Sequence, residues 1–333
     1  MKIKIDVDDI HQVLKASTGE NISIVAKGNA AYILGDIKSG KDDLSSDHVM
    51  CKSDFPWIDE PGKTLIDKEV LQSLPTNGEL TITEDTLECG NRMISYKPNR
   101  CYVEPISNFK EISTIKREIF NDLIEVEYAL AKDETRPTLT AACISGNEFV
   151  ALDGFRIAVR KSNEINVEET LLPGKLIKTY KKIKSKVNEV TILETENRVA
   201  LKVGNIVIVV TKLLGDYIKY KSVIPTEFSR QAEINSKELL SILKSYKKVD
   251  YVILNFTEEE LKVTAKNETL TIEDKLDCKF KGENLEIAFN HKYLMETIKH
   301  YENLTMKFTY SVGPMIITDD ESKLDVLLPV RIK

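Results

Sequence analysis

Residues 199–210 read VALKVGNIVIVV, and residues 235–246 read NSKELLSILKSY. The first stretch predicts two strands joined by a two-residue Gly204-Asn205 turn, because such tight turns need residues that tolerate a positive φ. The second predicts a helix, because its apolar residues recur at helical spacing behind a polar cap at Asn235. Together they show the unit from which the chain is built: short antiparallel strands followed by an amphipathic helix.

This unit recurs along the chain, with helix starts about 50 to 60 residues apart. Recurrence of one unit indicates an architecture assembled from similar modules. Each third of the chain holds two helices and several strands, so we expect an α+β fold of three repeated domains with antiparallel sheets, over residues 1–110, 111–228 and 229–333. The six helices are expected to begin near Asp6, Asp67, Thr114, Pro173, Asn235 and Asn290, and the third to extend to Ala131.

The composition is that of a globular protein with an acidic balance. Of 333 residues, 42% are hydrophobic and 30% charged, and the formal net charge is -6, which argues against a uniformly basic surface. No apolar run is long enough to span a membrane, and the N-terminal residues are typical of a strand rather than a signal peptide. Five scattered cysteines without a C-x-x-C pair suit a reducing compartment. We therefore expect a cytoplasmic protein with no cofactor and no bound metal.

Positive charge is concentrated on two of the predicted helices. Between Leu171 and Lys186 there are six lysines and no acidic residue. A solvated helix face is the plain interpretation of one such arc, but two arcs in an acidic protein favour loose, sequence-independent contact with phosphates. The first arc comprises Lys175, Lys178, Lys182 and Lys186, and the second comprises Lys237, Lys244, Lys247 and Lys248.

One stretch comes close to a catalytic motif. Residues 35–42, GDIKSGKD, nearly match a P-loop, but Asp42 stands where a magnesium-binding hydroxyl belongs, and Asp43 follows. Two carboxylates would repel a triphosphate, so a glycine-rich turn is the better interpretation. The histidines lack metal-ligand spacing, Asp153-Gly154 fits turn chemistry, and the sequence contains no nucleophile elbow or Cys/His pair. We expect no catalytic residues and no enzyme activity.

Several ordered stretches match one known family. Residues 132–139 (KDETRPTL) and 151–158 (ALDGFRIA) resemble the middle domain of the bacterial DNA polymerase III beta subunit, the sliding clamp. Residues 214–225 (LGDYIKYKSVIP) resemble the connector between the second and third domains of that family. Residues 289–294 (FNHKYL) and 327–332 (LLPVRI) resemble the third domain. Ser73-Leu74-Pro75 followed by Gly90 is a fainter match to the first domain, whose first 60 residues look shortened.

The resemblance implies a fold and a mechanism. Three domains with two helices each would form a half-ring, and two half-rings would close as a homodimer around double-stranded DNA. An inward lysine lining would hold the duplex without reading its sequence, and a polymerase bound to the rim could not diffuse away. The implied partners are DNA, the DNA polymerase III alpha subunit, the clamp loader and other clamp-motif proteins, with no membrane.

The resemblance also implies a cleft that takes short peptide segments of partner proteins, between the second and third domains. Three positions depart from the usual family pattern: Ile218 replaces a proline, Ser222 a basic residue and Phe155 a histidine. These departures leave open which peptide the cleft prefers. The matching residues are Leu139, Leu152, Gly154, Phe155, Arg156, Ile157, Ile218, Ser222, Val223, Tyr293, Val312, Leu328, Pro329, Val330 and Arg331.

By the same resemblance, two more surfaces are expected. The DNA-facing residues are Arg136, Lys175, Lys178, Lys182, Lys186, Lys237, Lys244 and Lys248. The dimer interface is expected to join the strand around Arg92, Ile94 and Tyr96 of one chain to the third domain near Tyr246–Lys248 of the other.

Two alternatives remain open at this point. One is a clamp-like interaction protein, phage- or plasmid-borne, that binds clamp partners without supporting replication; the altered cleft and short first domain motivate it. The other is a nucleotide-dependent enzyme that uses residues 35–41. Nucleotide binding that is lost in a Lys41→Ala variant would favour this alternative.

Overall fold

The computed structural model describes residues 1–38, 46–98, 104–266, 270–319 and 322–331. Within these ranges, all strand pairs whose register is known are antiparallel, so the expected α+β class with antiparallel sheets is confirmed. None of the helices in these ranges is long and apolar enough to cross a membrane.

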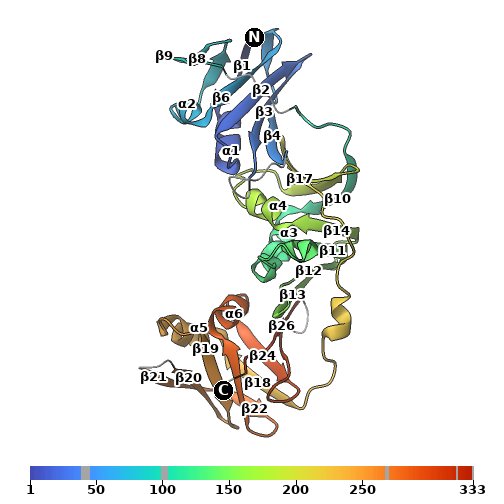
Figure 1. Cartoon of the computed structure of the whole chain (residues 1–333), viewed down its shortest axis with the longest axis vertical. Coiled ribbons are helices and arrows are strands. Elements are labelled where there is room, and N and C mark those ends of the chain that lie inside the picture. Colours follow the sequence, from blue (N-terminus) through green and yellow to red (C-terminus); the bar gives the residue numbers. More distant parts are fainter. Residues whose placement is uncertain (39–45, 99–103, 267–269, 320–321, 332–333) are drawn as a thin grey trace. The chain divides into compact units, whose positions relative to one another are not determined.

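Six α-helices occur in the described residues, and five begin where they are expected (Figure 1). The side chains of Asp6, Asn235 and Asn290 accept hydrogen bonds from the first turns of the first, fifth and sixth helices, which satisfies backbone donors that the helix itself leaves free. The helices are α1 (Val7–Ala16), α2 (Lys68–Gln72), α3 (Arg117–Leu123), α4 (Gly174–Tyr180), α5 (Ser236–Ser245) and α6 (His291–Ile298).

The third helix differs from its prediction over Thr114–Ala131. Residues Lys110–Lys116 instead form strand β10, which pairs with β15 (Glu189–Glu194). Helix α3 follows, and a 3-10 helix η1 covers Ile124–Ala129. The isoleucines and threonine of β10 favour a strand, and the distant partner strand supplies its hydrogen bonds, so tertiary pairing decides the local structure.

The first compact unit comprises residues 1–121 and 171–213 and contains two sheets. Strand β17 pairs with β4, with Ile206 opposite Cys51, and so joins segments far apart in sequence. The smaller sheet has the order β5 (Trp57–Glu60), β1 (Lys2–Asp6), β7 (Glu79–Ile82), β8 (Thr86–Cys89), β9 (Arg92–Ser95). The larger has the order β10, β15, β16 (Arg198–Val203), β17 (Ile206–Thr211), β4 (His48–Lys52), β3 (Ala30–Asp36), β2 (Asn21–Lys27), β6 (Gly62–Asp67).

The second compact unit comprises residues 122–170 and 214–333. Strand β13 pairs with β26, with Ile157 opposite Val326, so the middle of the chain is hydrogen-bonded to its C-terminal part. The larger sheet has the order β14 (Val167–Pro173), β11 (Ala141–Gly146), β12 (Glu148–Leu152), β13 (Arg156–Lys161), β26 (Lys323–Leu327), β25 (Met315–Thr318), β24 (Asn303–Phe308), β18 (Arg230–Asn235), β22 (Lys279–Lys281). The smaller has the order β21 (Thr271–Asp277), β20 (Glu260–Lys266), β19 (Tyr251–Phe256), β23 (Leu285–Asn290).

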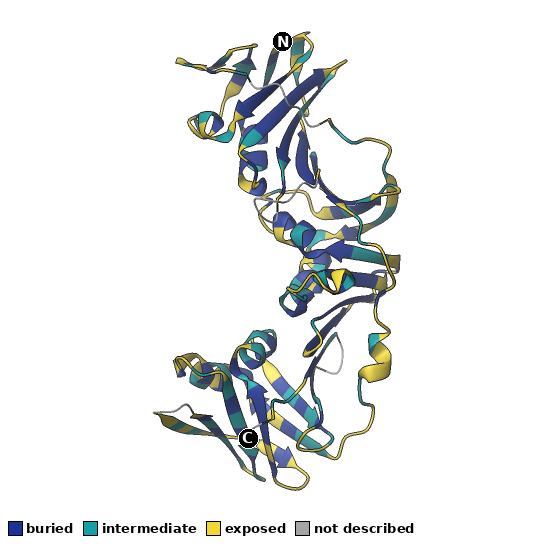
Figure 2. Cartoon of the chain, viewed as in Figure 1, coloured by how far each residue is buried: buried dark blue, intermediate teal, exposed yellow. Residues whose placement is uncertain are grey.

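A single apolar core holds the C-terminal third together. Helices α5 and α6 contact each other and bury Leu239, Leu243, Leu294 and Ile298 against the strands. In Figure 2, buried residues alternate with intermediate or exposed ones along these strands, as expected where one face of a strand packs on a core. Removing apolar surface from water contributes about 25 cal/mol per Å² to stability. Such a core is therefore the main stabilising contribution.

The two compact units do not follow the expected thirds. The larger sheet of the first unit combines strands from residues 21–67 with strands from 110–211, and that of the second combines strands from 141–173 with strands from 230–327. Sheets continue across both expected boundaries, near residues 110 and 228. The division into three domains therefore stays a prediction.

Candidate functional site

The turn between β12 and β13 presents an exposed aromatic side chain. Gly154 has φ +88°, a conformation that favours glycine. Asp153 Oδ1 accepts the backbone N–H groups of Phe155 (3.0 Å) and Arg156 (3.1 Å), so its carboxylate closes the turn, as its sequence context predicts. Phe155 remains 58% exposed, although a buried hairpin carries it.

Phe155 lies at a cavity of about 570 Å³ in the second unit. Arg156 and Tyr293, two other residues of the predicted cleft, also line it. The ring centroids of Phe155 and Tyr293 are 6.0 Å apart, at an interplanar angle of 39°. The structure therefore brings together three of the cleft residues from two distant stretches of sequence. Its charged lining was not predicted, and comprises Lys132, Asp133, Asp153, Asp250 and Lys292.

The remaining cleft residues fall into two groups. Leu139, Leu152 and Ile157 are buried, so their side chains belong to the core rather than to an open surface. The others lie at the surface or only partly buried, and the C-terminal segment runs beside the turn, because the Leu328 N–H donates to the Phe155 carbonyl (2.9 Å). These others are Ile218, Ser222, Val223, Val312, Leu328, Pro329, Val330 and Arg331.

Ile218 lines a second, smaller cavity of about 250 Å³, between the connector and strands β11 and β12. Glu148 of β12 fastens this connector: its carboxylate accepts from the Tyr220 hydroxyl and pairs with Lys221 (2.7 Å) and Lys161 (2.9 Å). Burial by itself would raise the pKa of Glu148, but these three donors hold it down at about 2. The connector is therefore tied by a carboxylate that stays ionised.

A buried charge network lies where β13 meets β26. Arg160 pairs with Asp325 (3.2 Å), and both side chains are almost completely buried. The hydroxyls of Tyr128 (2.6 Å) and Tyr301 (2.7 Å) donate to the same carboxylate. Burial opposes the charge of Arg160, but Asp325 raises the pKa of the guanidinium above its ordinary value. No motif in the sequence singles these residues out, because a buried pair forms only when two distant strands meet.

The lysine-rich segment is helical over only half of its expected length. Helix α4 ends at Tyr180, so Lys175 and Lys178 are helical, whereas Lys182 and Lys186 follow in an irregular segment. The prediction that these four lysines share one helical face is therefore wrong. Lys178, Lys182 and Lys186 are nevertheless exposed.

Arg117 holds the irregular segment that follows α4. Its guanidinium donates to the carbonyl oxygens of Ile183 (2.8 Å) and Ser185. At the end of α4, the backbone N–H groups of Lys182 and Ile183 donate to carbonyls three residues back rather than four, which is typical of a final helical turn. The segment beyond this turn is bound to Arg117 where the sequence pattern predicts further helix.

Lys175 is engaged inside the protein. Its ammonium group pairs with Asp47, whose side chain is completely buried. Asp47 also accepts from Arg198 (2.9 Å) and from the backbone N–H of Thr211 (2.7 Å). A buried carboxylate needs such partners, so this ion pair of Lys175 has a structural role, and the DNA contact of Lys175 stays a prediction.

A further basic residue lies near this segment. Lys68 donates to the carbonyl oxygen (2.9 Å) and hydroxyl (3.2 Å) of Ser17, the residue that caps the end of α1. Burial lowers the pKa of Lys68, and the nearby charge of Lys182 lowers it further. No pattern in the sequence singles out Lys68, because it is the single lysine of the short helix α2.

The other predicted DNA-facing residues are exposed in the second unit. Lys237 and Lys244 are on α5, whereas Lys248 follows the helix in a left-handed conformation at φ 57°. Arg136 is exposed on the loop before the 3-10 helix η2 (Pro137–Thr140).

Only some of the predicted dimer residues are available to a partner. Arg92 and Ile94 lie on β9, an edge strand of the five-stranded sheet. Tyr96 and Tyr246 are buried, and the Tyr246 hydroxyl donates to Asp274 (2.8 Å) within the same unit. These two tyrosine side chains are held within their own chain, and the predicted dimer interface stays a prediction.

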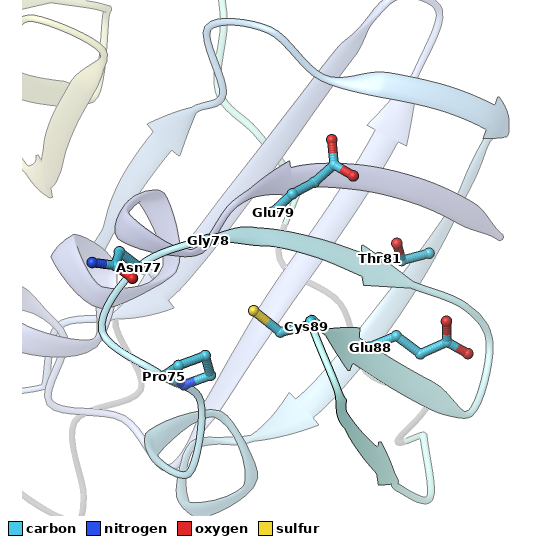
Figure 3. A pocket seen from close by; sticks show the side chains of 8 residues that line it. Pro75, Asn77, Gly78, Glu79, Thr81, Glu88 and Cys89 are labelled. Atoms are coloured by element: carbon cyan, nitrogen blue, oxygen red, sulfur yellow. The ribbon is translucent and has the colours of Figure 1, made fainter.

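A hollow of about 610 Å³ lies beside the β7–β8 hairpin (Figure 3). The carboxylates of Glu79 and Glu88 point away from the Cys89 thiol, so these groups do not converge on one point. Across the part of the chain that the structure describes, no group of three or more His, Cys, Asp or Glu side chains could hold a metal ion.

The P-loop-like stretch begins in a strand. Gly35 belongs to β3, and a Cβ there would lie 2.6 Å from the Cβ of Ser17, so glycine is needed for the close approach of α1. Gly40 and Lys41 lie outside the described residues, and the nucleotide-binding alternative is not tested.

Comparisons with known proteins agree over most of the chain. Residues 114–219 match the central domain of the DNA polymerase III beta subunit family, and residues 221–331 match its C-terminal domain. The chain is 29% identical over 238 residues to the beta sliding clamp of Chlamydia trachomatis, covering 66% of this chain and 57% of that protein. It is 26% identical over 294 residues to the beta sliding clamp of Staphylococcus epidermidis, covering 81% and 76%.

Solved structures share the fold. The DNA polymerase III beta subunit of Thermotoga maritima matches with a TM-score of 0.85 at 22% identity, over 99% of this chain and all of that chain. A putative beta subunit of Eubacterium rectale matches with a TM-score of 0.87 at 20% identity, over the whole of both chains. Because the two family domains follow each other over most of the sequence, the chain belongs to the DNA polymerase III beta subunit family.

Proposed function

We propose that this protein is a DNA sliding clamp, a non-catalytic processivity factor that encircles duplex DNA and tethers the replicative polymerase. The observation that carries the proposal is the match to both family domains, in order, over residues 114–331. The two relatives compared above bear the name beta sliding clamp. In this proposal, three domains over residues 1–110, 111–228 and 229–333 form a half-ring, and two chains close it as a homodimer in the cytoplasm.

The exposed lysines supply the DNA contact in this proposal. Lys178, Lys182 and Lys186 follow one another in the first unit, and Lys237, Lys244 and Lys248 in the second. Lysine ammonium groups attract phosphates of any sequence and do not read bases. The whole chain, these lysines included, has a net charge of -6, so the rest of the protein is acidic on balance and disfavours DNA. Such a lining permits sliding, because no contact depends on position along the duplex.

The cavity beside Phe155 receives the partner proteins. Phe155 and Tyr293 offer aromatic contact area, which commonly anchors a bound peptide. The partners are the DNA polymerase III alpha subunit, the clamp loader and other proteins that carry a clamp-binding peptide. Tethering raises the effective concentration of the polymerase at the primer end without a new DNA contact.

Retention on circular DNA tests the encirclement. The protein is loaded onto nicked circular DNA with a matching clamp loader, and the bound fraction is measured by gel filtration before and after the DNA is linearised. A ring stays on the circle and slides off the linear form. Equal retention on both forms would contradict the proposal.

Two variants identify the contacts. A Lys178→Glu/Lys182→Glu double variant should bind DNA more weakly, whereas Lys27→Glu, an exposed lysine of β2 outside both clusters, should not.

A clamp that also restores processive synthesis by a matching polymerase cannot be an interaction protein that lacks a role in replication.

A further inference from the structure

A buried arginine links the turn that carries Phe155 to helix α6. The Arg156 side chain is only 4% exposed. Its Nε donates to Asp153 Oδ2 (3.0 Å), one terminal nitrogen donates to Glu296 Oε2 (2.6 Å), and the other donates to the Tyr128 carbonyl. Three donors of the guanidinium are therefore bonded to groups of its own chain.

Two aromatic rings lie close to the same guanidinium. Its carbon lies 4.2 Å from the ring centroid of Tyr293 and 5.1 Å from that of Tyr128. Arginine interacts well with aromatic rings because its charge is spread over a plane. With two rings close by, three donors engaged and its side chain buried, Arg156 offers little to a bound peptide.

The geometry points to Glu296 as a positioning residue: through Arg156 and Asp153, it holds Phe155 at the cavity in the orientation that a partner contacts. This inference rests on the proposed binding of partner proteins at that cavity. The path has three steps. Glu296 fixes Arg156, Arg156 fixes one carboxylate oxygen of Asp153, and the other oxygen of Asp153 holds the backbone N–H groups of Phe155 and Arg156.

Charge and rigidity explain why this path matters for binding. Bonds between a guanidinium and carboxylates are roughly twice as strong as neutral hydrogen bonds. An exposed aromatic that is already held in place loses less conformational freedom when a partner binds. If Glu296 is neutral, Arg156 is held less firmly, the turn samples other orientations, and Phe155 is less often in the binding position.

The first test measures binding. The DNA polymerase III alpha subunit of the same organism is immobilised, and surface plasmon resonance compares wild type with Glu296→Gln, which keeps the shape and removes the charge. We expect affinity to fall about 3- to 10-fold, mainly through faster dissociation. Glu302→Gln, an exposed glutamate just beyond α6, is the matched control and should bind as wild type does.

A double-mutant cycle separates positioning from general structure. If Glu296 acts through Phe155, then Glu296→Gln should cost nothing further in a Phe155→Ala background, because the group that it positions is gone. Additive losses from the two substitutions would overturn the inference. Unchanged affinity of Glu296→Gln, with wild type binding normally, would overturn it as well.

A measurement without a partner keeps the inference separate from the proposed function. Hydrogen–deuterium exchange of residues 153–157 should be faster in Glu296→Gln than in wild type and in Glu302→Gln, with the rest of the chain unchanged. If wild type does not bind the alpha subunit, the proposed partner binding fails, and this exchange still decides whether Glu296 holds the turn. Equal exchange in all three proteins would contradict the positioning role.

Discussion

At the residue scale, several side chains have tasks that their neighbours in sequence do not reveal. Asp153 closes a turn, as its Asp-Gly context predicts, and it also receives Arg156. Lys175 has the context of a solvated lysine, yet it pairs with a completely buried carboxylate. The difference arises because the turn bonds are local, whereas the partner of Lys175 comes from a distant strand end.

Asp9 of α1 carries a charge that the fold disfavours. Burial raises the pKa of Asp9 above its ordinary value, although Asn205 (3.1 Å), Cys51 and Ser53 donate to it. A group with a raised folded-state pKa stabilises the protein below its unfolded pKa and loses that contribution as the pH rises through the folded value. We therefore expect Asp9→Asn to stabilise the protein at pH 8 by about 1 kcal/mol.

Urea denaturation at pH 8 and at stepwise lower pH checks this expectation. The gain should shrink as the pH falls toward the ordinary pKa of a carboxyl group. Asp8→Asn, a change in the same helix turn at an exposed site, is the control. A gain that is independent of pH would show that ionisation of Asp9 is not its cause.

The two lysines of α4 should respond differently to substitution. Lys175→Ala leaves the buried Asp47 with Arg198 as its cationic partner among the described residues, so we expect a loss of about 2 kcal/mol in unfolding free energy. Lys178→Ala removes an exposed charge, so stability should stay within about 0.5 kcal/mol. The DNA affinity of Lys178→Ala should fall. The slope of the logarithm of its binding constant against the logarithm of the salt concentration should become shallower by about one unit. Denaturation curves and DNA binding at several salt concentrations measure both; identical behaviour of the two variants would contradict the assignment.

At the element scale, caps and turns determine where elements begin, and tertiary partners determine where they end. Asn235 and Asn290 mark helix starts in sequence and in structure. The segment beyond α4 is bound to Arg117 instead of continuing the helix, and the strand β10 replaces helix because β15 pairs with it. Neither partner is close in sequence.

The connector around η3 (Tyr220–Val223) should depend on Glu148. Glu148→Gln removes the charge that pairs with Lys221 and Lys161, so we expect faster hydrogen exchange over residues 217–223. Exchange followed by mass spectrometry measures it, with Glu168→Gln on strand β14 as an exposed control. Equal exchange in both variants would show that Glu148 does not hold the connector.

The pH dependence of the same contact has a defined sign. The folded-state pKa of Glu148 is about 2, below the ordinary 4.5. A depressed pKa contributes stability that is present above the unfolded value and is lost as the pH falls through the folded value. The connector should therefore stay bound in wild type at neutral and mildly acidic pH and loosen only toward pH 2.

At the scale of the whole molecule, ring closure requires two chains. We expect light scattering to give twice the 37.8 kDa mass of one chain at micromolar concentration. Ile94→Asp on the edge strand β9 should shift the mass toward one chain, because a charge on a buried interface strand costs more than it gains. Ser95→Asp places the same charge at the neighbouring position of the strand, so a comparison of the two variants shows whether the position of the charge matters. A single-chain mass for wild type at all concentrations would contradict the homodimer.

Much of the fold could be predicted because its signals are local. Five of the six α-helices in the described residues start where the sequence predicts, three of them behind a side chain that caps the first turn. The Gly204-Asn205 hairpin forms with Val203 opposite Ile206. The cleft could be predicted only in part. Phe155, Arg156 and Tyr293 meet at one cavity, but Glu296, Tyr128 and Glu148 carry no sequence signal, because each acts through a partner from another element.

The amino-acid sequence by itself determined the α+β class, the family and most helix starts, since periodicity, caps and turns depend on neighbours along the chain. Only the tertiary structure decided which charges are engaged inside the protein, where α4 ends, and how the turn at Phe155 is held. The physical reason is that a buried ion pair or a strand partner is favourable only once folding has brought distant residues together and removed water from between them.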